Sequence, residues 1–417
     1  MWGRHRAANT FLYRTDALGP ATLLWGMSVA GRGGDIIFGW GGVSGGIGWG
    51  EVGFRVGEWW DGKGLGLFPW PALDVHDGAM SDARNTPLVA CAGIVTLDHI
   101  FRVDSLPTEE GKYSATGHIE VGGGVAANAA VTVTQLGGAA SFIGCVGDDR
   151  AGDDVLEQFA TLGVATDSMQ RVPNRETPIS FVLVDRDGHR ELVNYVSPDF
   201  FERANPVFAR GIADADAVLV DCRWPLGSVH ALEAAHSHNI PGVVDVDRPI
   251  DADPDTATGR IMDLATHLVF SRDALVGTTN EPDLPAALAA AARRSTAWIA
   301  VTDGPHGVLW LEGDQIRHQP ALHVRAVDTL GAGDVFHGAF ALALAEGSIE
   351  PEAVRFASAA AAAKCTQPGG RAGIPDRSMV NVLLNGIDGA IDVAPPGSST
   401  SNSLTSSARQ AEPSSGL

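Results

Sequence analysis

Short apolar runs alternate with longer stretches of helical periodicity through the middle of the chain. The apolar runs have the length of buried strands and occupy Leu88–Ile94, Ala217–Asp221, Val243–Val246, Leu268–Phe270 and Trp298–Val301. Apolar residues recur at helical spacing in Val125–Leu136, Val155–Leu162, Val229–His238, Leu284–Arg294 and Asp334–Ala345. This alternation predicts an α/β fold in which helices cover both faces of a mostly parallel central sheet.

Two segments depart from the alternation and predict a small second sheet. Lys112–Val121 alternates polar and apolar positions, and Phe181–Tyr195 is typical of a hairpin around Asp187-Gly188, a dipeptide suited to a type I′ turn. We expect these extended pieces, within about 97–121 and 178–197, to form a β-sheet lid that excludes water during a transfer reaction. The exposed edge of the hairpin would favour pairing with a second copy, which leaves a homodimer through the lid open.

The two ends of the chain differ from its middle. Residues 1–79 hold 7 of the 10 tryptophans and 19 of the 51 glycines, with neither helical nor strand periodicity. We expect this segment to be disordered or a non-native extension, with translation starting at Met80. Residues 80–392 then form the folded domain. Residues 393–417 are rich in Ser, Pro and Gly, and predict a disordered tail.

Charge and cysteine usage narrow the range of partners. A formal charge of −21 disfavours nucleic acid and anionic membranes, because the long-range field would repel both. An anionic substrate would therefore need cations placed close to it. No stretch is long and apolar enough to predict a membrane span. The four cysteines are scattered without metal-ligand spacing, which is typical of reduced residues in a cytoplasmic protein.

A glycine-rich turn leads into the predicted helix that starts at Asp334. The turn Gly331-Ala332-Gly333 would leave backbone N–H groups unpaired at the positive end of the helix dipole, which is a site for an anion. Asp334 beside it could take the proton of an attacking hydroxyl. The alternative is a glycine turn followed by an ordinary helix-start aspartate. A second aspartate at Asp328 and the small residues of the helix favour catalysis.

Two motifs give the chain a family resemblance. Asp328–Phe340 resembles the second signature of the ribokinase-like (PfkB) carbohydrate kinases, and Val121–Asn128 with Phe142–Asp149 resembles the first. The likeness covers roughly Leu88 to Pro375, in order and with the family spacing. It implies a ribokinase-like fold with a β lid. It also implies an ATP-dependent transfer to an alcohol group of a sugar, with Mg²⁺ as a cofactor.

The resemblance implies roles for single residues. The catalytic positions are matched by Asp334 as the base and by the amides of Gly331, Ala332 and Gly333 as an anion hole. The sugar-binding positions are matched by Asp98, Gly123, Gly124 and Asn128. The nucleotide-binding motif V-T-x-G-x-x-G is matched by Thr302, Gly304 and Gly307.

One family motif is missing. The N-x-x-E motif, which the family uses for Mg²⁺ and phosphate, would fall on 271–274, where neither the Asn nor the Glu is present. Asp273 or the pair Asp245/Asp247 could supply a carboxylate through water, since Mg²⁺ keeps much of its hydration. The metal ligands therefore stay unassigned. Some members hold a monovalent cation near the position of Asp328, which leaves such a cation open here.

Finer matches concern the acceptor sugar. The segments that resemble bacterial sulfofructose kinases are Gly111–Tyr113, Asn194–Asp199, Asp221–Trp224 and Lys364–Pro375. Those enzymes phosphorylate 6-deoxy-6-sulfofructose on its 1-hydroxyl, and the resemblance assigns the sulfonate to Lys112, Asn194 and Arg223. A sulfonate offers three acceptor oxygens and a permanent charge, which suits an ammonium, an amide and a forked guanidinium. The two cations would also meet the requirement set by the net charge.

Other acceptors and one other class stay open. Lys112 and Arg223 would serve the 6-phosphate of fructose 6-phosphate equally well, and Gly93–Asp98 also resembles ketohexokinase, which points to fructose. Ribose is a further candidate. A catalytically silent sugar-binding regulator would explain the missing N-x-x-E, although the intact Gly331–Asp334 segment argues against it. Taken singly, the three sulfonate candidates have structural explanations as solvated, salt-bridged or turn residues.

Overall fold

The computed structural model describes residues 86–204 and 212–386 in full, together with the backbone of four strands nearer the N-terminus. The chain divides into two units, Met1–Met80 and Ser81–Leu417. The predicted tail, residues 393–417, lies outside the described residues.

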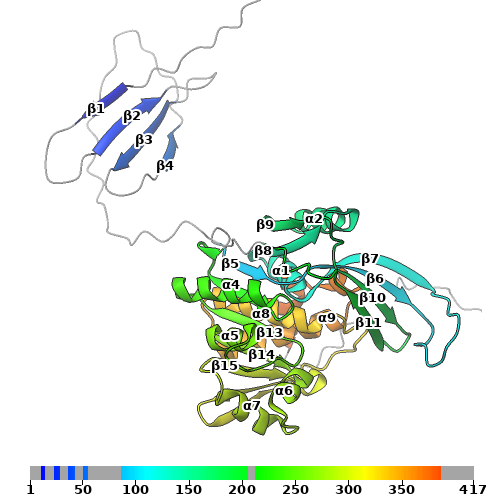
Figure 1. Cartoon of the computed structure of the whole chain (residues 1–417). Helices are drawn as coiled ribbons and strands as arrows, with labels where there is room; N and C mark the ends of the chain where they lie inside the picture. Colours follow the sequence, from blue (N-terminus) through cyan, green and yellow to red (C-terminus); the bar gives the residue numbers. More distant parts are fainter. Residues whose placement is uncertain are drawn as a thin grey trace, which may run out of the picture. The chain divides into compact units, whose positions relative to one another are not determined.

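The first unit contains a four-stranded antiparallel sheet (Figure 1). Its strands, in sheet order, are β1 (Phe11–Arg14), β2 (Leu23–Ser28), β3 (Ile36–Gly42) and β4 (Gly50–Phe54). The sequence pattern indicated no strand here. Glycines such as those at 39, 41 and 42 of β3 have no side chain to alternate, so they conceal the two-residue period. The start of translation at Met80 stays a prediction.

The second unit is built on a nine-stranded sheet. Its strands are β5 (Leu88–Ala92), β8 (Ala139–Gly147), β9 (Val164–Val172), β12 (Ala217–Asp221), β13 (Gly242–Val246), β14 (His267–Ser271), β15 (Trp298–Thr302), β16 (Val308–Glu312) and β17 (Gln315–Gln319). They follow the order β17-β16-β15-β14-β13-β12-β5-β8-β9. All pairs from β15 to β9 are parallel, and β16 and β17 join antiparallel at one edge. The predicted mostly parallel sheet is confirmed.

Helices cover both faces of this sheet (Figure 1). One face carries α1 (Val125–Gln135), α2 (Arg150–Thr161), α8 (Ala332–Ala345), α9 (Glu350–Cys365) and α10 (Arg377–Asn385). The other face carries α4 (Pro225–His238), α5 (Ala257–Leu264), α6 (Arg272–Thr279) and α7 (Leu284–Ala292). Side chains alternate along a strand, so Val89 of β5 enters the first core while Ala90 enters the second.

The lid is a separate four-stranded sheet with the order β11-β10-β6-β7. It consists of β6 (Thr96–Arg102), β7 (Gly117–Gly123), β10 (Ile179–Val184) and β11 (Arg190–Tyr195). The pairs β6–β7 and β10–β11 are antiparallel, whereas β10 pairs with β6 in parallel. Ile100, Val182 and Val184 pack together with Leu330. The lid therefore lies against the loop that leads into α8.

The hairpin predicted over Phe181–Tyr195 is present, but its connection differs from a two-residue type I′ turn. The loop runs over residues 185–189 between β10 and β11. The Asp185 carboxylate accepts hydrogen bonds from the backbone N–H groups of Asp187 and His189, each at 2.9 Å. An aspartate that binds the backbone of its own loop replaces the tight turn.

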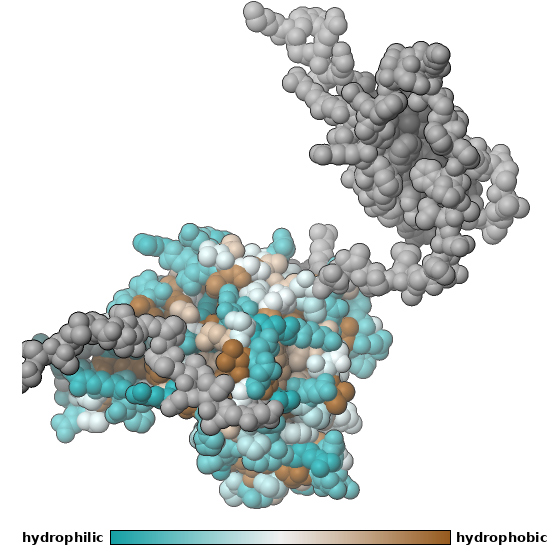
Figure 2. All heavy atoms as spheres, turned by 180° about the vertical axis from the view of Figure 1, so that it is seen from behind, coloured by the Kyte–Doolittle hydropathy of each residue, from teal (hydrophilic) through white to brown (hydrophobic). Residues whose placement is uncertain are grey.

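The surface of the second unit mixes polar and apolar residues on the face visible from behind (Figure 2). Within the described part of the chain, no helix combines the length and apolarity needed to cross a membrane.

Candidate active site

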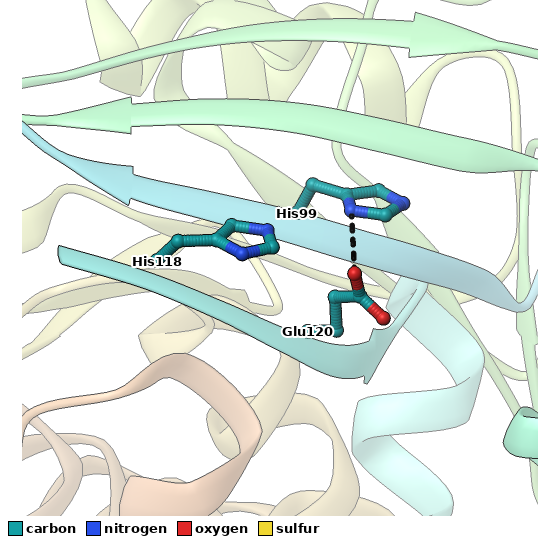
Figure 3. A group of neighbouring side chains, drawn as sticks. All are labelled: His99, His118 and Glu120. Carbon is teal, nitrogen blue, oxygen red and sulfur yellow. Dashed lines mark ion pairs between the residues drawn. The ribbon is translucent and has the colours of Figure 1, made fainter. Parts of the chain in front are cut away.

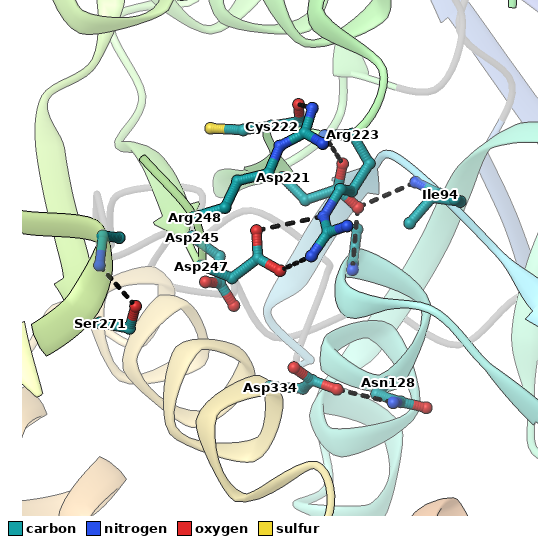
Figure 4. Close-up of polar contacts among 12 residues, drawn as sticks. Ile94, Asn128, Asp221, Cys222, Arg223, Asp245, Asp247, Arg248, Ser271 and Asp334 are labelled. Carbon is teal, nitrogen blue, oxygen red and sulfur yellow. Dashed lines mark hydrogen bonds and ion pairs between the residues drawn. The ribbon is translucent and has the colours of Figure 1, made fainter. Parts of the chain in front are cut away.

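Asp334 lies in the first turn of α8, three residues after a glycine in a left-handed conformation. Gly331 caps the helix at φ 79°, and the Asn128 amide donates a 2.6 Å hydrogen bond from Nδ2 to Asp334 Oδ2 (Figure 4). The first-turn N–H groups of a helix have no partner within the helix, which makes this end suitable for an anion. Ala332 N–H already donates to Thr329 O at 3.2 Å, so Gly333 is the more available donor of the two.

Burial raises the pKa of Asp334 to about 7, and the nearby negative charge of Asp245 adds to the increase. The hydrogen bond from Asn128 and the charge of His337 act in the opposite direction. A carboxylate with a pKa close to the working pH is well suited to accept a proton from a sugar hydroxyl.

A buried ion pair involves His337, which follows Asp334 by three residues on α8. Asp245 Oδ2 is 2.9 Å from His337 Nδ1, and each side chain is 3% exposed. Burial alone would lower the pKa of His337, but the Asp245 carboxylate outweighs burial and raises it to about 9. His337 also contacts the backbone carbonyl oxygens of Gly333 and Val269 at 2.7 and 3.2 Å. The sequence gives no signal for His337, because one polar residue inside an apolar helix forms no motif.

Arg371 connects Gly123 at the end of β7 with Asn128, the hydrogen-bond donor to Asp334. Its Nε donates to Asn128 Oδ1 at 2.9 Å, and its Nη2 donates to Gly123 O at 2.8 Å. Because the Asn128 oxygen is occupied in this way, the amide nitrogen must face Asp334. Burial lowers the pKa of Arg371 to about 10, which still leaves it charged at neutral pH. In the sequence, Arg371 lies within Lys364–Pro375, but neither its spacing nor the family resemblance indicates a role for it.

Asp98 approaches the same network from the lid. On β6, its Oδ1 accepts a 2.6 Å hydrogen bond from Thr96 Oγ1. A Cβ atom on Gly123 would lie 2.0 Å from Asp98 Oδ2, so the carboxylate fits only against a glycine. Gly124 is the N-terminal cap of α1, which carries Asn128. The structure thus brings together the four predicted sugar-binding residues and Asp334.

The three sulfonate candidates occupy different places. Asn194 of β11 pairs with Ser180 of β10, which pairs with Asp98 of β6, so Asn194 shares a lid face with Asp98. Arg223 follows β12 and forms an ion pair with Asp247 through Nε, at 3.2 Å from Oδ1, and through Nη2 (Figure 4). Lys112 is exposed between β6 and β7. No hydrogen bond or ion pair in the described ranges joins these three residues to one another.

Asp221 is a buried carboxylate to which the sequence assigns no role of its own, although it begins the matching segment Asp221–Trp224. Its Oδ2 accepts hydrogen bonds from Ile94 N at 2.8 Å and Ala126 N at 3.2 Å, and its Oδ1 accepts one from Arg223 N at 2.8 Å. Burial raises its pKa to about 7. Asp221 therefore ties the end of β12 to the loop after β5 and to the start of α1.

The predicted nucleotide residues border an open pocket of about 600 Å³. Its wall includes Ser271, Arg272, Asp273, Thr302, Asp303 and Gly304. Gly307 closes the adjacent turn at φ 93°, where a Cβ atom would lie 2.1 Å from Gln319 O. Thr302 and Gly304 are therefore in the pocket wall, and Gly307 shapes the turn beside it.

Comparisons with known proteins agree with this architecture. The model of the pfkB family carbohydrate kinases matches residues 86–377. Ribokinase of Bacillus subtilis is 31% identical over 303 residues, which cover 71% of this chain and 99% of the relative. A crystal structure of a provisionally assigned ribokinase from Agrobacterium tumefaciens is 36% identical with a TM-score of 0.69, over 74% of this chain and all of the other.

Arabidopsis thaliana ribokinase, solved in complex with ribose and ATP, is 26% identical. Its TM-score is 0.60, and the match covers 72% of this chain and 98% of the other. The family match spans both signature motifs, the lid and the nucleotide pocket. This chain belongs to the PfkB family of carbohydrate kinases and is an ATP-dependent sugar kinase.

Proposed function

We propose that Asp334 is the base that activates the acceptor hydroxyl for attack on the γ-phosphoryl group of ATP. The observation that carries the proposal is the hydrogen bond between Asn128 and Asp334. Arg371 joins Asn128 to the backbone of Gly123, the residue against which Asp98 packs. Asp98 would hold sugar hydroxyls, and the amides at the start of α8 would stabilise the charge that develops during transfer. ATP would occupy the pocket bordered by Thr302 and Gly304.

Mg²⁺ would neutralise the phosphates and is an expected cofactor. Asp245 is paired with His337 and Asp247 with Arg223, so both carboxylates already have cationic partners. Asp273 is exposed in the wall of the nucleotide pocket. Through a water ligand, Asp273 could reach a hydrated Mg²⁺ without breaking a buried ion pair.

The monovalent cation near Asp328 stays a hypothesis. Lys364 Nζ donates to the backbone oxygens of Asp328 and Gln367 at 3.3 and 3.1 Å. The Lys364 ammonium thus already provides a positive charge at the Asp328 carbonyl, close to where the monovalent cation would bind.

For the acceptor, we propose the 1-hydroxyl of 6-deoxy-6-sulfofructose. Asn194 supports this choice, because it shares a lid face with Asp98 and presents an amide donor there. Arg223 contacts Asp247 through Nε and Nη2, and the Nη1 hydrogens of its fork remain able to donate to a sulfonate. Lys112 would add a charge from the exposed segment of the lid.

Ribose is the second candidate, favoured by the similarity to ribokinases of Bacillus subtilis and Arabidopsis thaliana. A neutral sugar would use Asp98 and Asp334 in the same way and would leave Arg223 bound to Asp247. Fructose and fructose 6-phosphate are further alternatives within the same chemistry.

ADP formation with sulfofructose, fructose 6-phosphate, fructose and ribose, measured side by side, separates these acceptors. We expect the highest kcat/KM with sulfofructose, and a higher value with any other sugar would contradict that assignment. Asp334→Asn should lower kcat by about 10²–10⁴-fold while the sugar still binds. Asp283→Asn is the matched control, because asparagine caps α7 as well as aspartate does. Near-normal turnover of Asp334→Asn would refute the base assignment.

Arg223→Ala tests recognition of the anion separately from catalysis. We expect a larger increase in KM for sulfofructose than for fructose, because only the first carries a group for the guanidinium to bind. An equal increase for both sugars would show that Arg223 does not contact the anion.

A further inference from the structure

The face of the lid opposite Asp98 carries two histidines and a glutamate whose side chains converge (Figure 3). His99 lies on β6, and His118 and Glu120 lie on β7. His99 pairs directly with Glu120 across the two strands. His118 is two residues before Glu120, so all three side chains are on the same face of the sheet.

The potential ligand atoms are close together. One ligand atom from each residue can be chosen so that all three lie within 4.8 Å of one another. His99 Nδ1 is 3.5 Å from Glu120 Oε1. The imidazole rings of His99 and His118 are parallel within 4°, with centroids 5.8 Å apart. Phe101 stacks on His118 with a centroid distance of 4.4 Å.

These distances suit a tetrahedral metal ion. Zn²⁺ binds imidazole nitrogen and carboxylate oxygen at about 2.0–2.2 Å, which places neighbouring ligand atoms about 3.4 Å apart. The pair His99 and Glu120 already has this separation. Small rotations of His118 about its side-chain bonds would close the remaining gap, and the paired strands hold the three Cα atoms in position.

We propose that His99, His118 and Glu120 bind a divalent transition-metal ion of the Zn²⁺ class, with the remaining coordination position open to water. Two imidazoles and one carboxylate favour such an ion over Mg²⁺, which prefers oxygen ligands in an octahedron. This site is therefore separate from the Mg²⁺ that accompanies ATP.

The ion would connect the two strands that carry part of the sugar site. His99 follows Asp98, and consecutive strand residues point to opposite faces, so the metal lies behind the sugar-binding carboxylate. Gly123, against which Asp98 packs, is the last residue of β7, the strand that carries His118 and Glu120. A bound ion should hold β6 and β7 together close to Asp98.

A second group of histidine and carboxylate side chains provides a comparison. Asp185, Asp187 and His189 also converge, in the loop between β10 and β11. There the Asp185 carboxylate already accepts two backbone N–H groups at 2.9 Å and contacts His189 Nδ1 at 3.1 Å. These interactions close the loop and explain why the three side chains converge without a metal ion. The group of Asp185, Asp187 and His189 therefore serves as a control.

The test is Zn²⁺ titration of the full chain by calorimetry, without nucleotide and after removal of metals by a chelator. Co²⁺ is the spectroscopic probe, since four-coordinate Co²⁺ absorbs strongly in the visible range. We expect His118→Ala and Glu120→Gln each to weaken Zn²⁺ binding by at least about tenfold, the loss that even an outer-shell partner of a metal site causes. Both should also remove the Co²⁺ bands, and His189→Ala should do neither.

Sugar phosphorylation with Mg²⁺ and ATP checks that the His118→Ala and Glu120→Gln variants are folded. Unchanged Zn²⁺ affinity in either of these variants, while it remains active, would overturn the proposal. So would an equal loss of affinity in His189→Ala, or the absence of saturable Zn²⁺ binding to the unmodified chain.

Discussion

Asp334 is oriented by a series of hydrogen bonds that begins at Arg371. The guanidinium occupies the Asn128 oxygen and the Gly123 carbonyl, and Asn128 in turn donates to Asp334. A guanidinium has its donors fixed in a plane, so it can hold both acceptors at once, whereas an ammonium acts as a single point charge. Arg371 is thus a positioning residue for Asp334, the proposed base.

Replacing Arg371 by lysine should keep the charge and lose the orientation of Asn128. We expect kcat to fall on the order of 10²-fold, with a much smaller change in sugar affinity, because small displacements of a catalytic group have effects of this size. Steady-state kinetics together with calorimetric sugar binding would separate the two effects. Arg377→Lys is the control. Arg371 stacks on Phe159 at 5.3 Å and Arg377 stacks on Phe356 at 5.0 Å, but the Arg377 side chain is partly exposed. A kcat within about twofold of the parent would contradict the role of Arg371.

The raised pKa of Asp334 predicts how the rate depends on pH. As the proposed base, Asp334 must be ionised to accept a proton, and its pKa is about 7 because of burial and the charge of Asp245. As the pH falls below about 7, Asp334 becomes protonated, and kcat/KM should decrease about tenfold per pH unit. Initial rates over a pH series at constant ionic strength would show this acid limb. A flat profile down to about pH 5.5 would mean that a different group limits the reaction.

At the scale of elements, the site depends on where strands end and helices begin. Asp221 stands at the end of β12 and accepts backbone N–H groups from the loop after β5 and from α1. Gly93 lies so close that a Cβ atom there would be 2.2 Å from Asp221 Oδ2. One buried carboxylate thus sets the position of the helix that carries Asn128.

Asp221→Asn should destabilise this junction. An asparagine would direct an N–H donor at backbone donors, and a buried unsatisfied group costs about 1–3 kcal/mol. We expect a lower midpoint in denaturant unfolding. Asp216→Asn is the matched control, because Asp216 also accepts a strand N–H, from Leu88 at 2.8 Å, but is exposed. Equal stability of the two variants would show that Asp221 does not hold the junction.

At the scale of the whole molecule, the site lies where the parallel strands of the central sheet end. Loops at the carboxyl ends of parallel strands meet at one edge of a sheet, which is why ligands bind there in open α/β folds. Asp221 of β12, Asp245 of β13 and Ser271 of β14 mark this edge. The lid packs against Leu330, in the loop that leads into α8.

The first unit should be dispensable for catalysis. All the proposed site residues lie within residues 86–377, which match the family model. We expect a variant without residues 1–79 to keep kcat/KM within about twofold of the full chain, because a domain with its own core can act alone. Side-by-side kinetics with the same sugar would test this. A loss above about tenfold would assign residues 1–79 a part in the function.

The sequence by itself determined the α/β class, the lid hairpin and the position of the proposed catalytic segment. These features depend on local spacing, which hydrophobic periodicity and glycine turns reveal directly. Asp98, Gly123 and Asn128 could be assigned only through the family resemblance, because their motifs lie far from Asp334 in the chain. The antiparallel sheet of the first unit was missed because its glycines hide the alternation.

Only the tertiary structure decided which side chains support the site. Arg371, His337 and Asp221 each act through partners that are distant in sequence, such as Asn128, which is 243 residues from Arg371. A buried charge is tolerated when folding supplies its partner, and no local pattern records where that partner is. The same holds for the pairing of His99 with Glu120, which follows from strand register.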